Sequence, residues 1–463
     1  MAHSPAGKVL VIGLDCAAPR FVFGPDAFHL PNIQGLMRDG LWGQLRSCDP
    51  PITVPAWACM TSSKDPGALG CYGFRNRKDY SYDSLITATS SAIQEPRVWD
   101  VLSRAGKKVC VVGVPQTYPV RPVNGWLVAG FLAPGMDVEY AYPKSLKREL
   151  ETELGEVIFD VHDFRTEDKD ALLKRIYRLM ENRFAVARHL MSSKPWDFFM
   201  LVEMGVDRLH HAFWRFCDPG HPKFEPDNPY RQVFEAYYTA VDAEIGKLLA
   251  LVDDDTAVAV VSDHGARAMH GGFCINQWLI NEGHLVLKNE LSGRTRIEDC
   301  TIDWSKTRAW STGGYYARVF LNVEGRELEG IITPGEYERF RDMLMRQIIA
   351  LPGPDGAPMG NKVFRPEDIY KQVNGIAPDL LVYFGDLSWR SVGTVGFDTV
   401  YTFDNDTGPD DANHDYYGIF ILNDRTGGPS GERKNLNLMD VAPTILSQQG
   451  VPVPTDMQGK SIK

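Results

Sequence analysis

Residues 8–15 read KVLVIGLD, a short apolar run that ends on an aspartate, Asp15. A run that is apolar on both faces is typical of a strand buried in a parallel sheet that helices cover on both sides. Similar strand-like runs recur at residues 108–114, 197–204, 257–263, 379–384 and 417–422. Helical patterns alternate with them at residues 97–106, 170–192, 230–252, 335–350 and 438–449. The alternation predicts an α/β fold, a three-layer α/β/α sandwich around a mostly parallel central sheet.

One part of the chain interrupts this alternation. Residues 285–375 contain short mixed segments and a loop-like stretch, PGPDGAPMGNK, at residues 352–362. Glycine and proline at this density break regular elements. We therefore expect residues 1–284 and 376–463 to form the main domain, and residues 285–375 to form an inserted cap or accessory region.

Amino-acid composition and net charge limit the classes of molecule that the protein is expected to bind. The 463 residues carry a net charge of −11 and show no basic tract, so we expect no nucleic-acid polymer as a partner. A small phosphorylated molecule is compatible with this negative net charge if metals or local cations neutralise the charge of its phosphate. No apolar run reaches the roughly 18–20 residues of a membrane span, and the N-terminus lacks a signal-peptide pattern. The eight cysteines are scattered without a CxxC pair. These features predict a cytoplasmic protein with reduced thiols and no membrane partner.

Acidic side chains follow three of the predicted strands. Asp15, Asp207 and Asp263 each come at or just after a strand end. Ligands in open α/β sheets bind outside the carboxyl ends of the strands, so we expect these carboxylates to gather at one edge. Like charges gathered there repel each other unless a cation lies among them. The pattern therefore favours a metal site.

Three histidines are placed to complete such a site. Asp207 and His211 are four residues apart, so on a helix they face the same way and can hold one metal. His264 directly follows Asp263, and His414 lies in a loop before the last predicted strand. Each motif alone is more typical of a helix cap, a solvated helix face or a turn. Their conjunction predicts the site, and mixed Asp/His ligands suit zinc or manganese better than calcium or magnesium.

Residues 48–61, CDPPITVPAWACMT, place Thr53 among three prolines. Pro50 and Pro51 keep the approach extended, and Pro55 suits the first turn of a helix. Thr53 would then lie at a helix N-terminus, where backbone N–H groups favour an anion such as phosphate. Taken alone, the segment favours a plain helix cap, because a threonine hydroxyl is a poor nucleophile unless a base or a metal removes its proton.

In chain order, several segments resemble the alkaline phosphatase superfamily, and its type I phosphodiesterase/nucleotide pyrophosphatase branch in particular. The segments are IGLDCAAPRF (12–21), PPITVPAWACMTSSKDPGALGCYGF (50–74), EMGVDRLHHAFW (203–214), VVSDHGA (260–266), DTGPDDANHDYYGIFI (406–421) and the closing DVAPTILSQQGVPVPTDMQGKSI (440–462). The resemblance covers nearly the whole chain and implies an alkaline-phosphatase-like fold.

The resemblance also implies a mechanism and a set of site residues. Thr53 matches the family's nucleophile, and the matching metal ligands are Asp15, Asp263 and His264 for one ion, which also touches Thr53, and Asp207, His211 and His414 for the other. The implied activity is two-metal hydrolysis of phosphodiester or pyrophosphate bonds in small phosphorylated substrates such as nucleotides. It passes through a covalent phospho-threonine intermediate, with zinc expected and manganese as the alternative.

Substrate contacts are less well marked in the sequence. The candidates are Arg267, His270, Tyr72, Arg75 and the aromatic residues of WSTGGYYARVF (310–320). Each is equally or better explained by a surface or packing role.

Two alternatives to the expected activity stay open. One is a phosphomonoesterase or phosphomutase of the same superfamily, and the other is a non-catalytic nucleotide- or carbohydrate-binding module that retains the fold. The second ester substituent of a diester needs an open, partly apolar groove. A monoester instead needs an extra cation near its third non-bridging phosphoryl oxygen.

Overall fold

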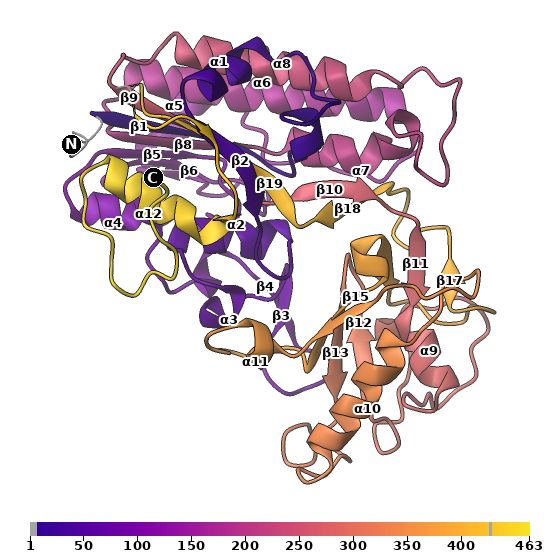
Figure 1. The fold of residues 1–463 in the computed structure, drawn as a ribbon. Helices are drawn as coiled ribbons and strands as arrows, with labels where there is room; N and C mark the ends of the chain where they lie inside the picture. The colour runs from indigo at the N-terminus through magenta and orange to yellow at the C-terminus, as the bar shows by residue number, and fades with distance from the viewer. Residues whose placement is uncertain (1–6, 426–427) are drawn as a thin grey trace.

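A large sheet lies between two layers of helices in the computed structural model, which describes residues 7–425 and 428–463 (Figure 1). Its strands, in spatial order, are β20 (Gly431–Glu432), β2 (Leu41–Arg46), β19 (Tyr417–Asn423), β9 (Thr256–Val261), β1 (Lys8–Leu14), β8 (Phe198–Glu203), β5 (Val109–Val112), β6 (Gly125–Val128) and β7 (Ala141–Tyr142), and β21 (Leu436–Asn437) also pairs with β2. The strands from β9 to β6 run parallel, and β19 is antiparallel to both of its neighbours. The mostly parallel α/β sandwich is confirmed.

Helices cover both faces of this sheet (Figure 1). One layer consists of α1 (Pro31–Arg38), α5 (Lys144–Leu154), α6 (Lys169–Ser193), α7 (Gly205–Cys217) and α8 (Val233–Leu249). The other consists of α2 (Thr53–Ser62), α4 (Val98–Arg104) and α12 (Val441–Gln448), with the short α3 (Pro66–Leu69) beyond α2. In the part of the chain that is described, no helix combines the length and the apolar character that crossing a bilayer requires.

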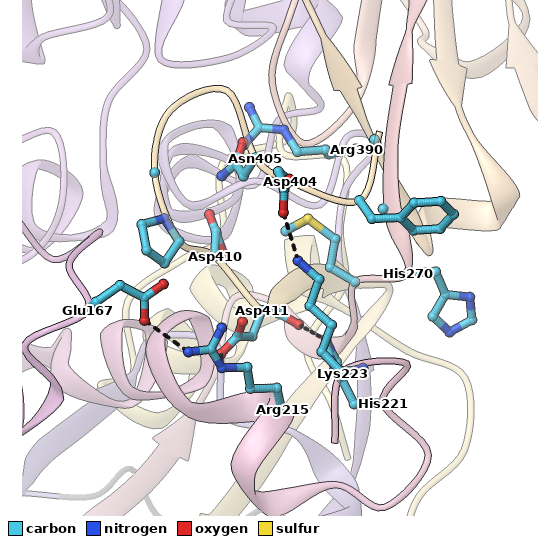
Figure 2. A pocket seen from close by; sticks show the side chains of 16 residues that line it. Glu167, Arg215, His221, Lys223, His270, Arg390, Asp404, Asn405, Asp410 and Asp411 are labelled. Carbon is cyan, nitrogen blue, oxygen red and sulfur yellow. Dashed lines mark hydrogen bonds and ion pairs between the residues drawn. The ribbon is translucent and has the colours of Figure 1, made fainter. Parts of the chain in front are cut away.

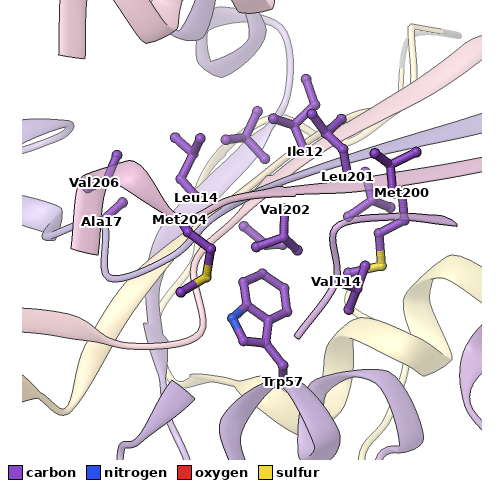
Figure 3. Close-up of a cluster of buried hydrophobic side chains, with 14 of the residues drawn as sticks. Ile12, Leu14, Ala17, Trp57, Val114, Met200, Leu201, Val202, Met204 and Val206 are labelled. Carbon is purple, nitrogen blue, oxygen red and sulfur yellow. The ribbon is translucent and has the colours of Figure 1, made fainter. Parts of the chain in front are cut away.

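Trp57 holds α2 against the sheet (Figure 3). Its side chain is fully buried among residues of β1 and β8 such as Leu14 and Val202. The close approach requires a glycine in β1, because a Cβ at Gly13 would lie 2.5 Å from the indole ring. The indole Nε1 donates a hydrogen bond of 2.6 Å to Asp15 Oδ2. Trp57 thus ties α2 to the carboxyl end of β1, and the N-terminus of α2 carries Thr53.

A smaller antiparallel sheet forms a second centre of packing (Figure 1). Its strands are β12 (Ala309–Thr312), β13 (Ala317–Leu321), β15 (Leu380–Tyr383) and β14 (Lys362–Phe364), and α9 (Ile275–Asn281), α10 (Tyr337–Ile349) and α11 (Pro366–Ile369) accompany it. Its hydrophobic cluster includes residues from Phe273 to Tyr401, on both sides of the expected 285–375 boundaries. The strand expected at 379–384 within the main domain therefore belongs to this sheet as β15. An apolar run identifies a strand but does not identify the sheet that it joins.

Three small sheets, two of two strands and one of three strands, complete the fold of the described residues. They are β3 (Arg75–Arg77) with β4 (Leu85–Thr87), β10 (Gly265–Ala268) with β18 (Ala412–Asp415), and β11 (Gly271–Cys274) with β16 (Trp389–Val392) and β17 (Tyr401–Thr402). The β10–β18 pair places His414 opposite Ala266, on the strand that directly follows His264.

Candidate active site

The seven residues expected to form the site converge at the carboxyl end of the central sheet. Asp15 follows β1, Asp263 and His264 follow β9, Asp207 and His211 lie on α7 directly after β8, His414 lies on β18, and Thr53 is the first residue of α2. Their side chains are all buried. Segments up to four hundred positions apart in the chain therefore meet as the topology of a parallel sheet requires.

The first cluster consists of Asp15, Asp263 and His264, whose ligand atoms all lie within 4.8 Å of one another. His264 Nε2 is 3.2 Å from Asp263 Oδ2 and 3.8 Å from Asp15 Oδ1. The same nitrogen lies 3.2 Å from Thr53 Oγ1. The hydroxyl of Thr53 is therefore within reach of any ion held by this cluster.

The second cluster consists of Asp207, His211 and His414. Asp207 Oδ1 is 3.3 Å from His211 Nε2 and 3.6 Å from His414 Nε2, and the two imidazole nitrogens are 3.1 Å apart. Ligand atoms about 2.0–2.2 Å from one tetrahedral ion lie about 3.3–3.6 Å from one another. The spacing within each cluster therefore suits one ion bound by its three side chains.

One carboxylate oxygen of each aspartate supports this interpretation. Asp15 Oδ1, Asp263 Oδ2 and Asp207 Oδ1 are buried and have no hydrogen-bond partner among residues 7–425 and 428–463. A buried charged oxygen is costly unless it is paired or binds a metal. All three oxygens face the histidine nitrogens of their own cluster, so the donor set fits two divalent cations.

The three histidines are oriented alike. In each, Nδ1 faces an acceptor outside the cluster: Asp410 Oδ1 at 2.7 Å for His211, the Gly265 carbonyl at 3.0 Å for His264, and the Pro51 carbonyl at 3.0 Å for His414. A proton on Nδ1 leaves the lone pair of Nε2 pointing into the cluster, as metal binding requires.

The clusters are electrostatically strained by their own negative charge. Burial, together with the charges of Asp263 and Asp207, raises the pKa of Asp15 well above its usual range. Burial also raises the pKa of Asp263. Burial alone would lower the pKa of His211, but the carboxylates of Asp410 and Asp207 outweigh it and raise that pKa to about 9. Bound cations would offset this accumulation of charge.

A cavity of about 670 Å³ opens beside Thr53, between the central sheet and the smaller sheet. Its lining includes five aromatic residues and six arginines: Phe74, Phe131, Phe164, Tyr315 and Tyr316, and Arg75, Arg165, Arg208, Arg296, Arg318 and Arg390. Part of the wall is thus apolar and part is cationic. Tyr315 and Tyr316 belong to the 310–320 segment that the sequence marked as a possible lining.

The expected substrate contacts divide into two groups. Arg75 lines the cavity, whereas Tyr72, Arg267 and His270 are not part of its wall. Tyr72 is buried and its hydroxyl donates to the Asn374 carbonyl at 2.7 Å.

The other two residues have partners or surroundings outside the Thr53 cavity. Arg267 forms an ion pair of 3.1 Å with Asp415 Oδ1. His270 lies at the edge of a separate cavity of about 230 Å³, in which Glu167 pairs with Arg215 and Lys223 with Asp404 (Figure 2).

Sequence reasoning missed Asp410, which supports the second cluster from outside. Its Oδ1 faces His211, and its Oδ2 accepts hydrogen bonds from Arg165 Nε at 3.1 Å and from the Tyr315 hydroxyl at 3.0 Å. The acidic stretch 404–415 contains five aspartates. Nothing in their spacing distinguishes the one that contacts a histidine.

The sequence model of the type I phosphodiesterase/nucleotide pyrophosphatase family matches residues 9–410. The chain belongs to this family. It is therefore a metal-dependent phosphohydrolase of the alkaline phosphatase superfamily. The matched range contains every residue of both clusters except His414, which the fold supplies from the following strand.

Solved structures share the fold over the whole chain. Human ectonucleotide pyrophosphatase/phosphodiesterase 5 (ENPP5) is 13% identical, with 98% of this chain and 97% of that chain covered and a TM-score of 0.56. Phosphonoacetate hydrolase from Sinorhizobium meliloti 1021, in complex with phosphonoformate, is 16% identical, with 96% of each chain covered and a TM-score of 0.59. The alkaline phosphatase PafA is 13% identical, with 100% and 99% covered and a TM-score of 0.57.

A further solved structure is that of an inactive form of murine ENPP5 in complex with AMP. Its sequence is 12% identical to this chain, 96% of each chain is covered, and the TM-score is 0.55. No curated protein sequence matches the chain.

Proposed function

We propose that the protein is a two-metal phosphodiesterase or nucleotide pyrophosphatase that acts on small phosphorylated substrates, with Thr53 as its nucleophile. The position of the Thr53 hydroxyl carries the proposal. It lies 3.2 Å from a nitrogen of the first cluster and also borders the cavity of about 670 Å³, which Asp207, His211 and His414 of the second cluster line as well. A phosphate placed there would meet a nucleophile and both ligand clusters at once.

Divalent cations at the two clusters, zinc or manganese by the donor set, would lower the pKa of the Thr53 hydroxyl and neutralise charge on the phosphoryl oxygens. The Thr53 hydroxyl gives its proton to solvent and Oγ forms a bond to phosphorus, while the bond to the ester oxygen breaks and that oxygen leaves with the electron pair. Water subsequently hydrolyses the phospho-threonine, which restores the hydroxyl and releases a phosphate monoester. Such a reaction depends chiefly on positioning and charge stabilisation.

The N-terminus of α2 adds to the phosphate site. The N–H groups of Thr53 and Val54 belong to the first turn and have no partner within the helix. Pro55 follows them at the third position, where its missing N–H costs the helix nothing. The positive end of the helix dipole therefore faces the transferred phosphoryl group.

The shape of the cavity supports a diester substrate over a monoester. Its volume suits a ligand with a second ester arm, since small-molecule sites typically measure about 300–1,000 Å³. The cations nearest the second cluster are already neutralised, because Arg208 pairs with Asp160 at 2.7 Å and Arg165 with Asp410 at 3.1 Å. A nucleotide suits the aromatic part of the wall, and AMP occupies the related murine ENPP5.

Side-by-side kinetics test the proposal. The protein is reconstituted with zinc or with manganese and assayed on bis-p-nitrophenyl phosphate and on p-nitrophenyl phosphate. We expect a higher kcat/KM for the diester, and a preference for the monoester would overturn the choice of substrate. Elemental analysis should find two equivalents of metal per chain, and purified protein that takes up no transition metal would refute the assignment of the clusters.

A further inference from the structure

The arginines that line the Thr53 cavity are not equivalent. Four of the six have a carboxylate partner: Arg165 with Asp410 at 3.1 Å, Arg208 with Asp160 at 2.7 Å, Arg296 with Glu298 at 3.5 Å, and Arg390 with Asp406 at 3.5 Å. Their charge is compensated within the protein. The positive charge that remains available to a ligand belongs to the other two, Arg75 and Arg318.

Arg75 and Arg318 form a pair without a counter-charge. Across residues 7–425 and 428–463, no carboxylate lies within ion-pair distance of either guanidinium. Arg318 donates a hydrogen bond from its guanidinium to the main-chain carbonyl of Arg75, so the two residues are held together. Both border the cavity that contains Thr53. The Arg75 side chain is exposed and the Arg318 side chain is half-buried, so an incoming ligand can reach both.

Arg77, on the same strand as Arg75, has a structural role. Arg77 lies two residues beyond Arg75 on β3, and its side chain is buried. It forms an ion pair of 3.0 Å with Glu327, whose side chain is fully buried. The strand thus satisfies one arginine internally and leaves the other open to the cavity.

We propose that Arg75 and Arg318 form an anion subsite that binds a second phosphate of the substrate, next to the phosphoryl group that Thr53 attacks. The proposal rests on the function proposed above and specifies its substrate class. A planar guanidinium matches the oxygens of a phosphate and remains charged at all working pH values. The protein as a whole carries a net charge of −11, so a multiply charged substrate needs local positive charge to enter. The preferred substrates are therefore nucleoside di- and triphosphates rather than diesters with uncharged arms.

Two substrates that differ in charge test this subsite. ATP carries phosphates beyond the one attacked, whereas the p-nitrophenyl ester of thymidine 5′-monophosphate does not. In Arg75→Ala and in Arg318→Ala, the KM for ATP should rise roughly tenfold to a hundredfold, as expected for the loss of one charge-assisted hydrogen bond or more. The kcat/KM for the nitrophenyl ester should stay within about twofold.

Two further variants separate charge from structure. Arg75→Lys keeps the charge and should recover part of the affinity for ATP. Arg175→Ala removes an exposed arginine from α6, outside the cavity. It should change neither the KM for ATP nor the kcat/KM for the nitrophenyl ester. Equal losses on both substrates in Arg75→Ala would show a structural role and overturn the proposal. An unchanged KM for ATP would overturn it as well.

The outcome for the wild-type protein distinguishes the two proposals. Wild-type protein that fails to hydrolyse the nitrophenyl ester contradicts the proposed function. The subsite is then tested by equilibrium binding of AMP and of α,β-methylene-ADP to the zinc-loaded protein. Tighter binding of the methylene analogue, lost in Arg75→Ala and Arg318→Ala, supports the subsite, and equal binding of the two nucleotides refutes it.

Discussion

Replacing Asp410 by asparagine should weaken metal binding at one cluster and spare the other. The two oxygens of this buried carboxylate serve different partners, since Oδ1 faces His211 at 2.7 Å and Oδ2 accepts from Arg165 and Tyr315 at 3.1 and 3.0 Å. An asparagine nitrogen accepts no hydrogen bond, so either His211 or the Arg165–Tyr315 pair loses its acceptor. Changing the outer partner of a metal-binding histidine typically costs about 10–100-fold in affinity, which is about 1.4–2.8 kcal/mol.

Chelator competition on the metal-loaded protein measures this loss site by site. One of the two metal equivalents in Asp410→Asn should bind about 10–100-fold more weakly, and the equivalent held by Asp15, Asp263 and His264 should be unchanged. The matched control is Asp404→Asn in the same loop, because the Asp404 side chain is 87% exposed and pairs with Lys223, away from both clusters. If both equivalents weaken alike, or neither does, Asp410 does not act through His211.

Three further variants probe the nucleophile, its support and the pH response. Thr53→Ala should lower diester turnover by roughly 10³-fold or more while both metal equivalents persist; full activity would exclude the covalent mechanism. Trp57→Phe removes the indole donor to Asp15 and should lower the free energy of unfolding by about 1–3 kcal/mol in urea titrations of the zinc-loaded protein; unchanged stability would show that this hydrogen bond contributes nothing. Burial lowers the pKa of His221 to about 4, so below pH 6.5 the unfolded chain binds a proton that the folded chain does not. Wild-type protein should therefore lose about 2 kcal/mol more stability than His221→Gln between pH 7 and pH 5, and equal losses would contradict this assignment.

The parts of the fold that could be read from the sequence are those that local patterns determine. The run at residues 8–14 is a strand over the same residues, and the five expected helices are present with ends within three residues of prediction. Strands such as β6, with four residues, and β2, with a glycine at its centre, are too short or too irregular to stand out. The sheet that β15 joins depends on contacts with β13 and β14, which a run of apolar residues does not encode.

The same distinction separates the residues of the two ligand clusters from those that surround them. Asp207 and His211 are one helical turn apart, and Asp263 and His264 are adjacent, so each pair is visible locally. Support and recognition instead depend on distant partners: Asp410 meets Arg165 across 245 positions of sequence. Arg318 meets the carbonyl of Arg75 across 243 positions.

Strand ends therefore position most ligands of the two clusters, whereas the packing of the smaller sheet against the central sheet positions the residues that we propose to recognise the substrate. Because Arg318 comes from β13 and Arg75 from the β3–β4 hairpin, a change in how the smaller sheet packs would alter the anion subsite without moving either metal cluster. Proteins that share this fold at 13–16% identity can therefore differ in the substrate that they accept.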